Sequence, residues 1–148
     1  MTKAAYDTDF YAWTQAQAEA LRIKDWPALD LDHLAEEIDS LGIADEHAIT
    51  RQLQRLLLHL LKWCYQPAHR TPSWRRSIRQ ARDAIADRIT RSPSLRDYPT
   101  RRVLLIYRRA RRDAADETGL PLATFPEICP WPIARVLDED FWPGDEAG

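Results

Sequence analysis

The sequence predicts an all-α fold: a single bundle of about five helices with a proline-rich C-terminal strap. Apolar residues recur at helical spacing along most of the 148 residues, and no segment alternates in the way of a half-buried strand. With 45% hydrophobic residues, the chain can bury one sizeable core. We therefore expect one domain over residues 1–148, with core helices over about 8–118 and the strap over 120–143.

The first two helices are predicted from caps and apolar spacing. One runs from about residue 8 to residue 23, with Asp7 or Thr8 as its N-terminal cap. The next begins at Leu31, where apolar residues follow at the i, i+3, i+4 and i+7 offsets of a core-facing stripe. Glycine is common just beyond a helix C-terminus, so Gly42 predicts the end of this helix.

Three further helices are expected before the strap. Residues 44–65 form the most apolar stretch and hence a central helix. Thr71 and Pro72 start the fourth helix, because threonine caps a helix and proline fits its first turn. The fifth begins near Pro99 and ends at Gly119.

The C-terminal segment differs in composition from the helices before it. Five of the ten prolines lie beyond residue 120, so only one short helix is expected there, at about 133–138. Four large aromatic residues in this segment predict a strap that is anchored across the bundle. These residues are Phe125, Trp131, Phe141 and Trp142.

Basic residues are concentrated in one part of the chain. Residues 70–112 hold fourteen arginines and three aspartates, whereas the rest of the chain holds seven basic and twenty acidic residues. Arginine outnumbers lysine by eighteen to three, which favours forked pairing with carboxylates or phosphates. The predicted interaction surface consists of Arg75, Arg76, Arg79, Arg82, Arg101, Arg102, Arg108, Arg109, Arg111 and Arg112.

Three kinds of partner suit this surface. The chain's own acids can neutralise it, within one molecule or across a homodimer; these acids are Glu36, Glu37, Asp39, Asp45 and Glu46. An acidic protein surface is the second partner. Nucleic acid is the third, with Trp74, Tyr98 or Tyr107 stacking on bases, although the pI of about 6.1 and the lack of a helix-turn-helix signature speak against it.

One histidine-carboxylate pattern is a weak metal candidate. His33, Glu36 and Glu37 lie within one helical turn, and His47 and His59 follow on the next predicted helix. The spacing is neither that of a zinc peptidase nor its inverse. We expect no metal and no cofactor here.

His59 is surrounded by leucines, so its ring needs a hydrogen-bonding partner. We expect Glu36 or Glu37, or an arginine of the fourth helix, to supply it in a buried structural network. The alternative is that the same residues transfer protons in an acid-base enzyme. No catalytic residue is assigned, because the sequence indicates no pocket beside them.

Other classes of protein have little support. No GxSxG elbow or glycine-rich phosphate loop is present, and neither Cys64 nor Cys129 belongs to a CxxC motif. No secretory leader and no apolar run of about 20 residues is visible, so we expect a cytoplasmic protein that does not cross a membrane. A non-enzymatic interaction protein is the predicted function.

Several short runs resemble a known family. The chain is similar to the bacterial family of domain of unknown function twenty-nine (DUF29) in the order and spacing of these runs, over nearly its whole length. They are residues 33–38 (HLAEEI), 57–63 (LLHLLKW), 66–67 (QP), 92–95 (SPSL) and 125–130 (FPEICP). The resemblance implies a small all-helical protein. It implies no activity, so no residue role is carried over from it.

Overall fold

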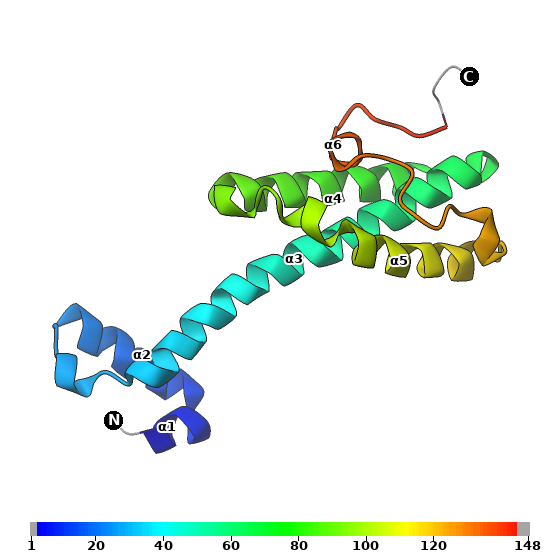
Figure 1. Cartoon of the computed structure of the whole chain (residues 1–148). Coiled ribbons are helices and arrows are strands. Elements are labelled where there is room, and N and C mark those ends of the chain that lie inside the picture. The colour runs from blue at the N-terminus through cyan, green and yellow to red at the C-terminus, as the bar shows by residue number, and fades with distance from the viewer. Residues whose placement is uncertain (1–2, 145–148) are drawn as a thin grey trace. The chain divides into compact units, whose positions relative to one another are not determined.

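The computed structural model describes residues 3–144, and its regular structure is helical (Figure 1). In chain order the helices are α1 Lys3–Thr8, α2 Phe10–Arg22, α3 Leu31–Tyr65, α4 Pro72–Arg91, α5 Tyr98–Thr118 and α6 Ile133–Val136. Short 3₁₀ turns lie at Trp26–Ala28, Pro67–His69, Pro93–Leu95 and Leu122–Thr124. No strand occurs between residues 3 and 144, so the predicted all-α class is confirmed.

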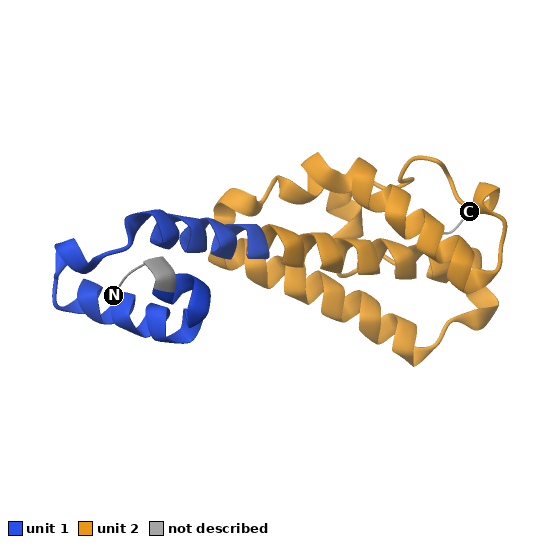
Figure 2. Cartoon of the chain, turned by 90° about the horizontal axis from the view of Figure 1, so that it is seen from below, with its two compact units in different colours: residues 1–44 blue, residues 45–148 orange. Residues whose placement is uncertain are grey.

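The chain divides into two compact units, residues 1–44 and residues 45–148 (Figure 2). The first part of α3 belongs to unit 1 and the rest to unit 2. Unit 1 has nine acidic and three basic residues, whereas unit 2 has fourteen acidic and eighteen basic residues. The two units therefore carry opposite net charges. The prediction of one domain over residues 1–148 stays a prediction.

Gly42 does not end a helix, and the prediction that one helix stops there and another starts at residue 44 is wrong. A single helix, α3, runs through this position. A C-terminal glycine acts by taking a left-handed conformation, as Gly119 does beyond α5 with a φ of 72°. Gly42 has no positive φ. A glycine inside a helix costs only about 1 kcal/mol, which the flanking turns of α3 outweigh.

We expect Gly42→Ala to raise the free energy of unfolding by about 0.5–1 kcal/mol, because alanine loses less conformational freedom on folding. A Cβ atom at this position would meet no atom within 4 Å. Gly119→Ala is the matched control, and it should lower stability because a side chain is strained at a φ of 72°. Urea denaturation measures both changes. A loss of stability in Gly42→Ala would contradict the continuous helix.

The apolar stripe at the start of α3 is exposed, although its spacing is typical of a core-facing helix. Leu31, Ile38 and Leu41 have 68%, 66% and 71% of their surface exposed. The spacing of these residues identifies an apolar face, but it does not say what covers that face. We call Leu31, Ile38 and Leu41 the α3 stripe.

The N-terminal cap of α2 is Asp9 and not Asp7 or Thr8. The Asp9 side chain accepts a hydrogen bond from the backbone N–H of Ala12 at 3.0 Å. Thr8 and Asp7 instead belong to α1, a short helix that the periodicity of the sequence does not predict. The predicted start of the first long helix is therefore correct to within two residues.

Unit 1 is held together by polar contacts between α2 and residues 28–30, which lead into α3. Gln17 is only 2% exposed, and its side chain accepts from the backbone N–H of Asp30 at 2.7 Å and donates to the Ala28 carbonyl at 3.3 Å. The Trp13 indole, also 2% exposed, donates to the Asp30 carboxylate at 3.2 Å. A buried amide with both ends bonded fixes the packing of the two helices.

The core of unit 2 is built from the second part of α3 together with α4 and α5, as Figure 1 shows. The predicted central role of residues 44–65 is confirmed, because the most deeply buried aliphatic residues lie there. The fully buried side chains of these three helices include Ile49, Leu53, Leu56, Leu57, Leu60, Leu61, Ile78, Ile85 and Ile106. This core holds α4 and α5 in place, and these two helices carry the arginines of the predicted interaction surface.

The C-terminal segment packs on α3, α4 and α5 as a strap with aromatic anchors, as predicted. Phe125 and Phe141 are buried, and the ring of Trp142 lies 4.9 Å from that of Trp63 on α3. The hydroxyl of Tyr107 on α5 donates to the Pro126 carbonyl at 2.6 Å. Aromatic burial and a buried hydrogen bond together stabilise the strap against the helices.

Candidate functional site

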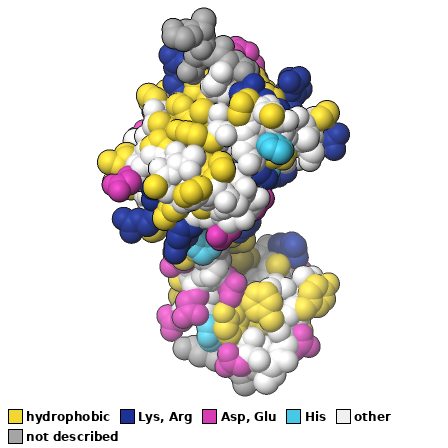
Figure 3. Space-filling model, turned by 90° about the vertical axis from the view of Figure 1, so that its right-hand side faces the viewer, with side chains coloured by type: hydrophobic (Ala, Val, Ile, Leu, Met, Phe, Trp, Pro, Cys, Tyr) yellow, Lys and Arg dark blue, Asp and Glu magenta, His cyan; other side chains and the backbone are white. Residues whose placement is uncertain are grey.

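Eight of the ten arginines predicted to form an interaction surface are exposed. They are Arg75, Arg76 and Arg79 on α4, and Arg101, Arg102, Arg108, Arg109 and Arg112 on α5. On the face that Figure 3 shows, Lys and Arg side chains lie around the rim of unit 2 together with a few Asp and Glu side chains, whereas Asp and Glu side chains predominate on unit 1.

The other two arginines hold the strap, and the placement of Arg82 on an interaction surface is wrong. Arg82 is 4% exposed and donates to the backbone carbonyls of Val136 at 2.9 Å and Phe141 at 2.8 Å. Arg111 is partly buried and donates to the Phe125 carbonyl at 3.1 Å. Burial lowers the pKa of Arg82, but a guanidinium remains charged at neutral pH.

The arginines of α5 surround an exposed leucine. Helical neighbours lie three, four and seven residues apart, and five arginines have these spacings from Leu105, which is 38% exposed. We call this set the α5 arginine face: Leu105 with Arg101, Arg102, Arg108, Arg109 and Arg112. It combines positive charge with apolar surface on one side of a rigid helix.

Carboxylates of the described residues form no ion pair with this face. None of the ten predicted arginines has a carboxylate oxygen within 4.0 Å in the part of the chain that the structure describes. Of the five acids expected to pair with the arginines, Asp45 forms an ion pair with Arg88. Glu37 instead accepts a hydrogen bond from Tyr6. The predicted pairing within one molecule is therefore limited to Arg88 among the described arginines of α4 and α5.

Two cavities flank the α5 arginine face. One, of about 600 Å³, is lined by Arg101, Arg102 and Arg109 together with Glu46, His47, Thr50 and Tyr98. The other, of about 530 Å³, is lined by Arg108, Arg111 and Arg112 together with Leu122 and Glu127. Each cavity contains one carboxylate among its arginines, so neither is a purely cationic site.

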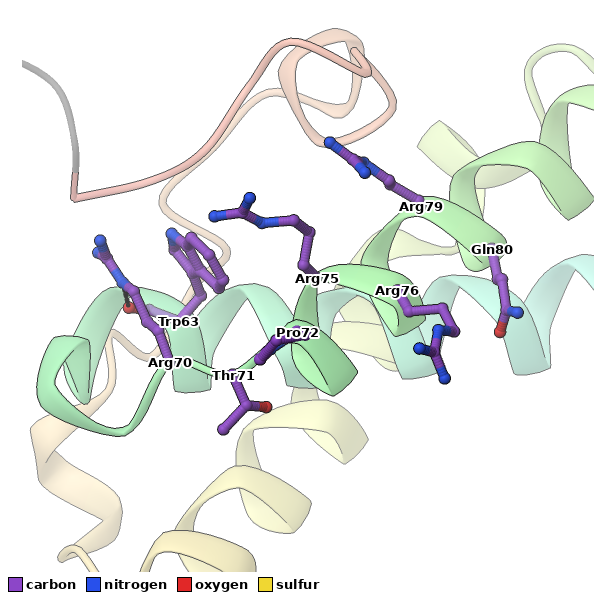
Figure 4. A pocket seen from close by; sticks show the side chains of 8 residues that line it. All are labelled: Trp63, Arg70, Thr71, Pro72, Arg75, Arg76, Arg79 and Gln80. Carbon is purple, nitrogen blue, oxygen red and sulfur yellow. Dashed lines mark hydrogen bonds between the residues drawn. The ribbon is translucent and has the colours of Figure 1, made fainter.

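A third cavity, of about 440 Å³, lies at the start of α4 and has no acidic lining residue. Figure 4 shows its residues, which include a tryptophan that the sequence alone does not indicate as part of a site: Trp63, Arg70, Thr71, Pro72, Arg75, Arg76, Arg79 and Gln80. The signal in the sequence was only the position of Trp63 one turn before the Pro67 helix stop.

The aromatic residues predicted to stack on bases are not available for stacking. Tyr107 is 1% exposed and Tyr98 is 7% exposed, and the Tyr98 hydroxyl is bonded to Thr50 at 3.0 Å. Trp74 packs against the core of unit 2, with the Lys62 ammonium 4.7 Å from its ring centroid. Base stacking needs an open ring face, so these three residues do not form a platform for single strands.

The sequence match covers most of the chain. Residues 5–142 match the family model described as "Domain of unknown function DUF29". The chain belongs to the DUF29 family. No curated protein and no solved structure matches it. The resemblance of the short motifs is thereby confirmed, and the function of this DUF29 chain has to be inferred from its own residues.

The histidine-carboxylate pattern of the DUF29 chain forms a hydrogen-bonded cluster in unit 1. The His33 ring contacts the Asp30 carboxylate at 2.7 Å and stacks on the Tyr6 ring with centroids 3.8 Å apart. The Tyr6 hydroxyl donates to Glu37 at 2.5 Å, and this bond raises the pKa of Tyr6 to about 12. Burial alone would raise the pKa of Asp30, but hydrogen bonds from His33 and Trp13 hold it below its usual value.

The predicted network of Glu36, Glu37 and His59 does not form. It required residues 36 and 37 to lie on a separate antiparallel helix, whereas one helix contains all three residues. The His59 ring bonds instead to the backbone carbonyl of Arg55 at 2.8 Å, one turn earlier. Burial lowers the pKa of His59.

The DUF29 chain gathers no metal-binding group in the region that the structure describes. Between residues 3 and 144, no three His, Cys, Asp or Glu side chains lie together in a way that would hold an ion. His33 and Glu37 share the cluster in unit 1, His47 lines the cavity beside α5, and His59 bonds to its own helix. None of the described helices is both long and apolar enough to cross a bilayer.

Proposed function

We propose that this DUF29 chain is a non-enzymatic interaction protein whose α5 arginine face binds an acidic protein surface. One observation carries the proposal: five arginines surround Leu105 on a rigid helix, and no described carboxylate oxygen lies within 4.0 Å of their nitrogen atoms. Exposed arginines that combine forked hydrogen bonds with apolar contact are typical of protein interfaces.

A second copy of the chain is the partner that fits best. The α3 stripe, Leu31, Ile38 and Leu41, is exposed and apolar, and it belongs to unit 1, which has nine acidic and three basic residues. An apolar stripe on a negatively charged unit complements an apolar centre with a positive border. The α5 arginine face of one copy and the α3 stripe of another therefore match in both charge and hydrophobicity.

Nucleic acid is the alternative partner, and the aromatic residues count against it. Binding through phosphates alone remains chemically open to the arginines of α4 and α5. Recognition of single strands depends strongly on base stacking, however, and the candidate rings at positions 74, 98 and 107 are packed into unit 2.

A cytoplasmic location belongs to the same proposal, because Cys64 and Cys129 are not joined in a disulfide.

Sedimentation velocity tests this proposal. We expect the wild-type chain to self-associate at low salt and to dissociate as salt rises, because exposed charge pairs are screened. Arg108→Glu with Arg112→Glu should remain monomeric, since it places negative charges against the acidic surface of unit 1. A matched double variant, Arg91→Glu with Arg96→Glu, changes the same charge outside the α5 arginine face and should associate like the wild type.

Two results would contradict self-association through the α5 arginine face. A wild-type chain that is monomeric at every concentration and salt would rule out the second copy as the partner. If the same arginine variants abolish salt-sensitive binding of DNA or RNA instead, the alternative partner replaces it.

A further inference from the structure

We infer that the cavity at the start of α4 is a binding site for a phosphoryl group. It is lined by Trp63, by the guanidinium groups of α4 and by the residues that begin this helix. The inference rests on the proposed function only in taking the exposed arginines as open to a ligand. Its ligand, its residues and its test are separate from those of the α5 arginine face.

The chemistry of the lining is that of an anion site. Three exposed arginines, Arg75, Arg76 and Arg79, contribute positive charge, and none of the residues that line the cavity is acidic. The Gln80 side-chain oxygen is already occupied as the acceptor of a hydrogen bond from Arg55 at 3.2 Å, which leaves the Gln80 amide with donors to offer. By contrast, each cavity beside α5 includes a glutamate.

A buried donor without a partner points into the same site. Trp63 is 3% exposed, and its indole nitrogen has no hydrogen-bond acceptor among the described residues. Buried indole N–H groups normally find an acceptor, so this one calls for a ligand oxygen. Figure 4 shows the indole between the guanidinium groups of Arg70 and Arg75, with its nitrogen on their side.

Aromatic contacts hold these groups in place before a ligand arrives. The Arg75 guanidinium lies 5.6 Å from the Trp63 ring centroid and 5.7 Å from that of Trp142. Arg79 lies 5.9 Å from the Trp142 ring. Such stacking lowers the conformational freedom that the arginines lose on binding, which favours affinity.

The start of α4 adds to the positive potential. Thr71 caps the helix and Pro72 occupies its first turn, and the cavity lies against both. The N-terminus of a 20-residue helix carries partial positive charge and favours anions. Helix end, guanidinium groups and indole N–H therefore all favour the same kind of ligand.

A phosphoryl group suits this set better than a carboxylate. A carboxylate has two oxygens and a single charge, which one arginine fork satisfies. A phosphate monoester has three terminal oxygens and nearly two negative charges, which matches several guanidinium groups and one further N–H donor. The phosphoryl group comes either from a free phosphate compound or from a phosphorylated side chain, and both present the same oxygens.

Nuclear magnetic resonance on the whole chain tests the site. The six tryptophans give six indole N–H signals, and Trp63→Phe identifies that of Trp63. We expect inorganic pyrophosphate and a phosphoserine peptide to shift the Trp63 signal, whereas acetate at equal ionic strength leaves it in place. The tighter of the two ligands identifies the source of the phosphoryl group.

Variants separate a built site from general charge attraction. Arg75→Gln should weaken pyrophosphate binding about tenfold, because a charge-assisted hydrogen bond is lost. Arg91→Gln removes the same charge at the far end of α4 and should change the affinity by less than about twofold. Circular dichroism confirms that each variant is folded. If Trp63→Phe does not fold, the wild-type spectrum with the two arginine variants still provides the test.

An unmoved Trp63 signal in the presence of both phosphoryl ligands would overturn the inference. Equal losses of affinity in Arg75→Gln and Arg91→Gln would overturn it as well. Arg108→Glu with Arg112→Glu distinguishes the two proposals, because it should abolish self-association and leave pyrophosphate binding in place. If pyrophosphate does not bind, the α5 arginine face is unaffected as a proposal.

Discussion

Arg82→Met is expected to lower the free energy of unfolding by about 3 kcal/mol, which is large for one residue of a small protein. The substitution keeps an apolar stem of similar length but removes the donors to the carbonyls of Val136 and Phe141. Hydrogen bonds from a charged group contribute about 1.5–3 kcal/mol each. The Arg82 Nη1 atom is buried without a partner among the described residues, so relief of that cost offsets part of the loss.

Chemical denaturation measures this loss, and hydrogen exchange locates it. Exchange should accelerate most at residues 133–142, because Arg82 holds that part of the strap. Arg91→Met is the matched control on the exposed end of α4 and should change stability by less than about 0.5 kcal/mol. If Arg82→Met were as stable as the wild type, the strap would not depend on this residue.

Leu57→Ala and Leu41→Ala should have very different effects, although both remove the same atoms from α3. Leu57 is 0% exposed in the core of unit 2, so its truncation should cost about 2–5 kcal/mol in transfer free energy and cavity formation. Leu41 is 71% exposed, so its truncation should cost less than about 0.5 kcal/mol.

Both leucine variants should be compared by urea denaturation at a protein concentration where the chain is monomeric, because association adds apparent stability. At higher concentration and low salt, Leu41→Ala should weaken self-association while Leu57→Ala, once folded, should not. A large loss of monomer stability in Leu41→Ala would mean that the α3 stripe is buried.

Much of the fold follows from local signals in the sequence. Thr71 with Pro72 starts α4 and Gly119 ends α5 because each residue has a conformational preference that acts within one turn. The prediction that a helix ends at Gly42 is wrong because a glycine ends a helix only where its backbone adopts the left-handed conformation. That choice depends on the residues packed around the position, which local spacing does not reveal.

The helical periodicity of the sequence predicts the burial of Arg82, whereas the residue type does not. Arg82 lies four residues after Ile78 and three before Ile85, both fully buried, so it shares their stripe. Arg82 was predicted to lie on the surface because arginine side chains are usually exposed. The carbonyls that Arg82 binds belong to residues more than fifty positions later, and no local rule indicates such a contact.

The candidate site was predictable as a charge pattern only. The exposed arginines of α5 lie where their helical spacing places them. The cavity at Trp63 depends instead on how the strap, α3 and α4 meet. The indole N–H of Trp63 lacks a partner as a result of that packing, so no sequence motif predicts it.

Charge-swap complementation tests the central claim that the α5 arginine face binds the α3 stripe and the acidic surface of unit 1 around it. One variant carries Arg108→Glu with Arg112→Glu, and the other carries Asp32→Arg with Asp39→Arg, which reverses two exposed acids on one flank of α3. Each should sediment as a monomer alone, and an equimolar mixture of the two should associate, because the reversed charges again attract. A mixture that stays monomeric while the wild type associates would contradict this pairing of surfaces.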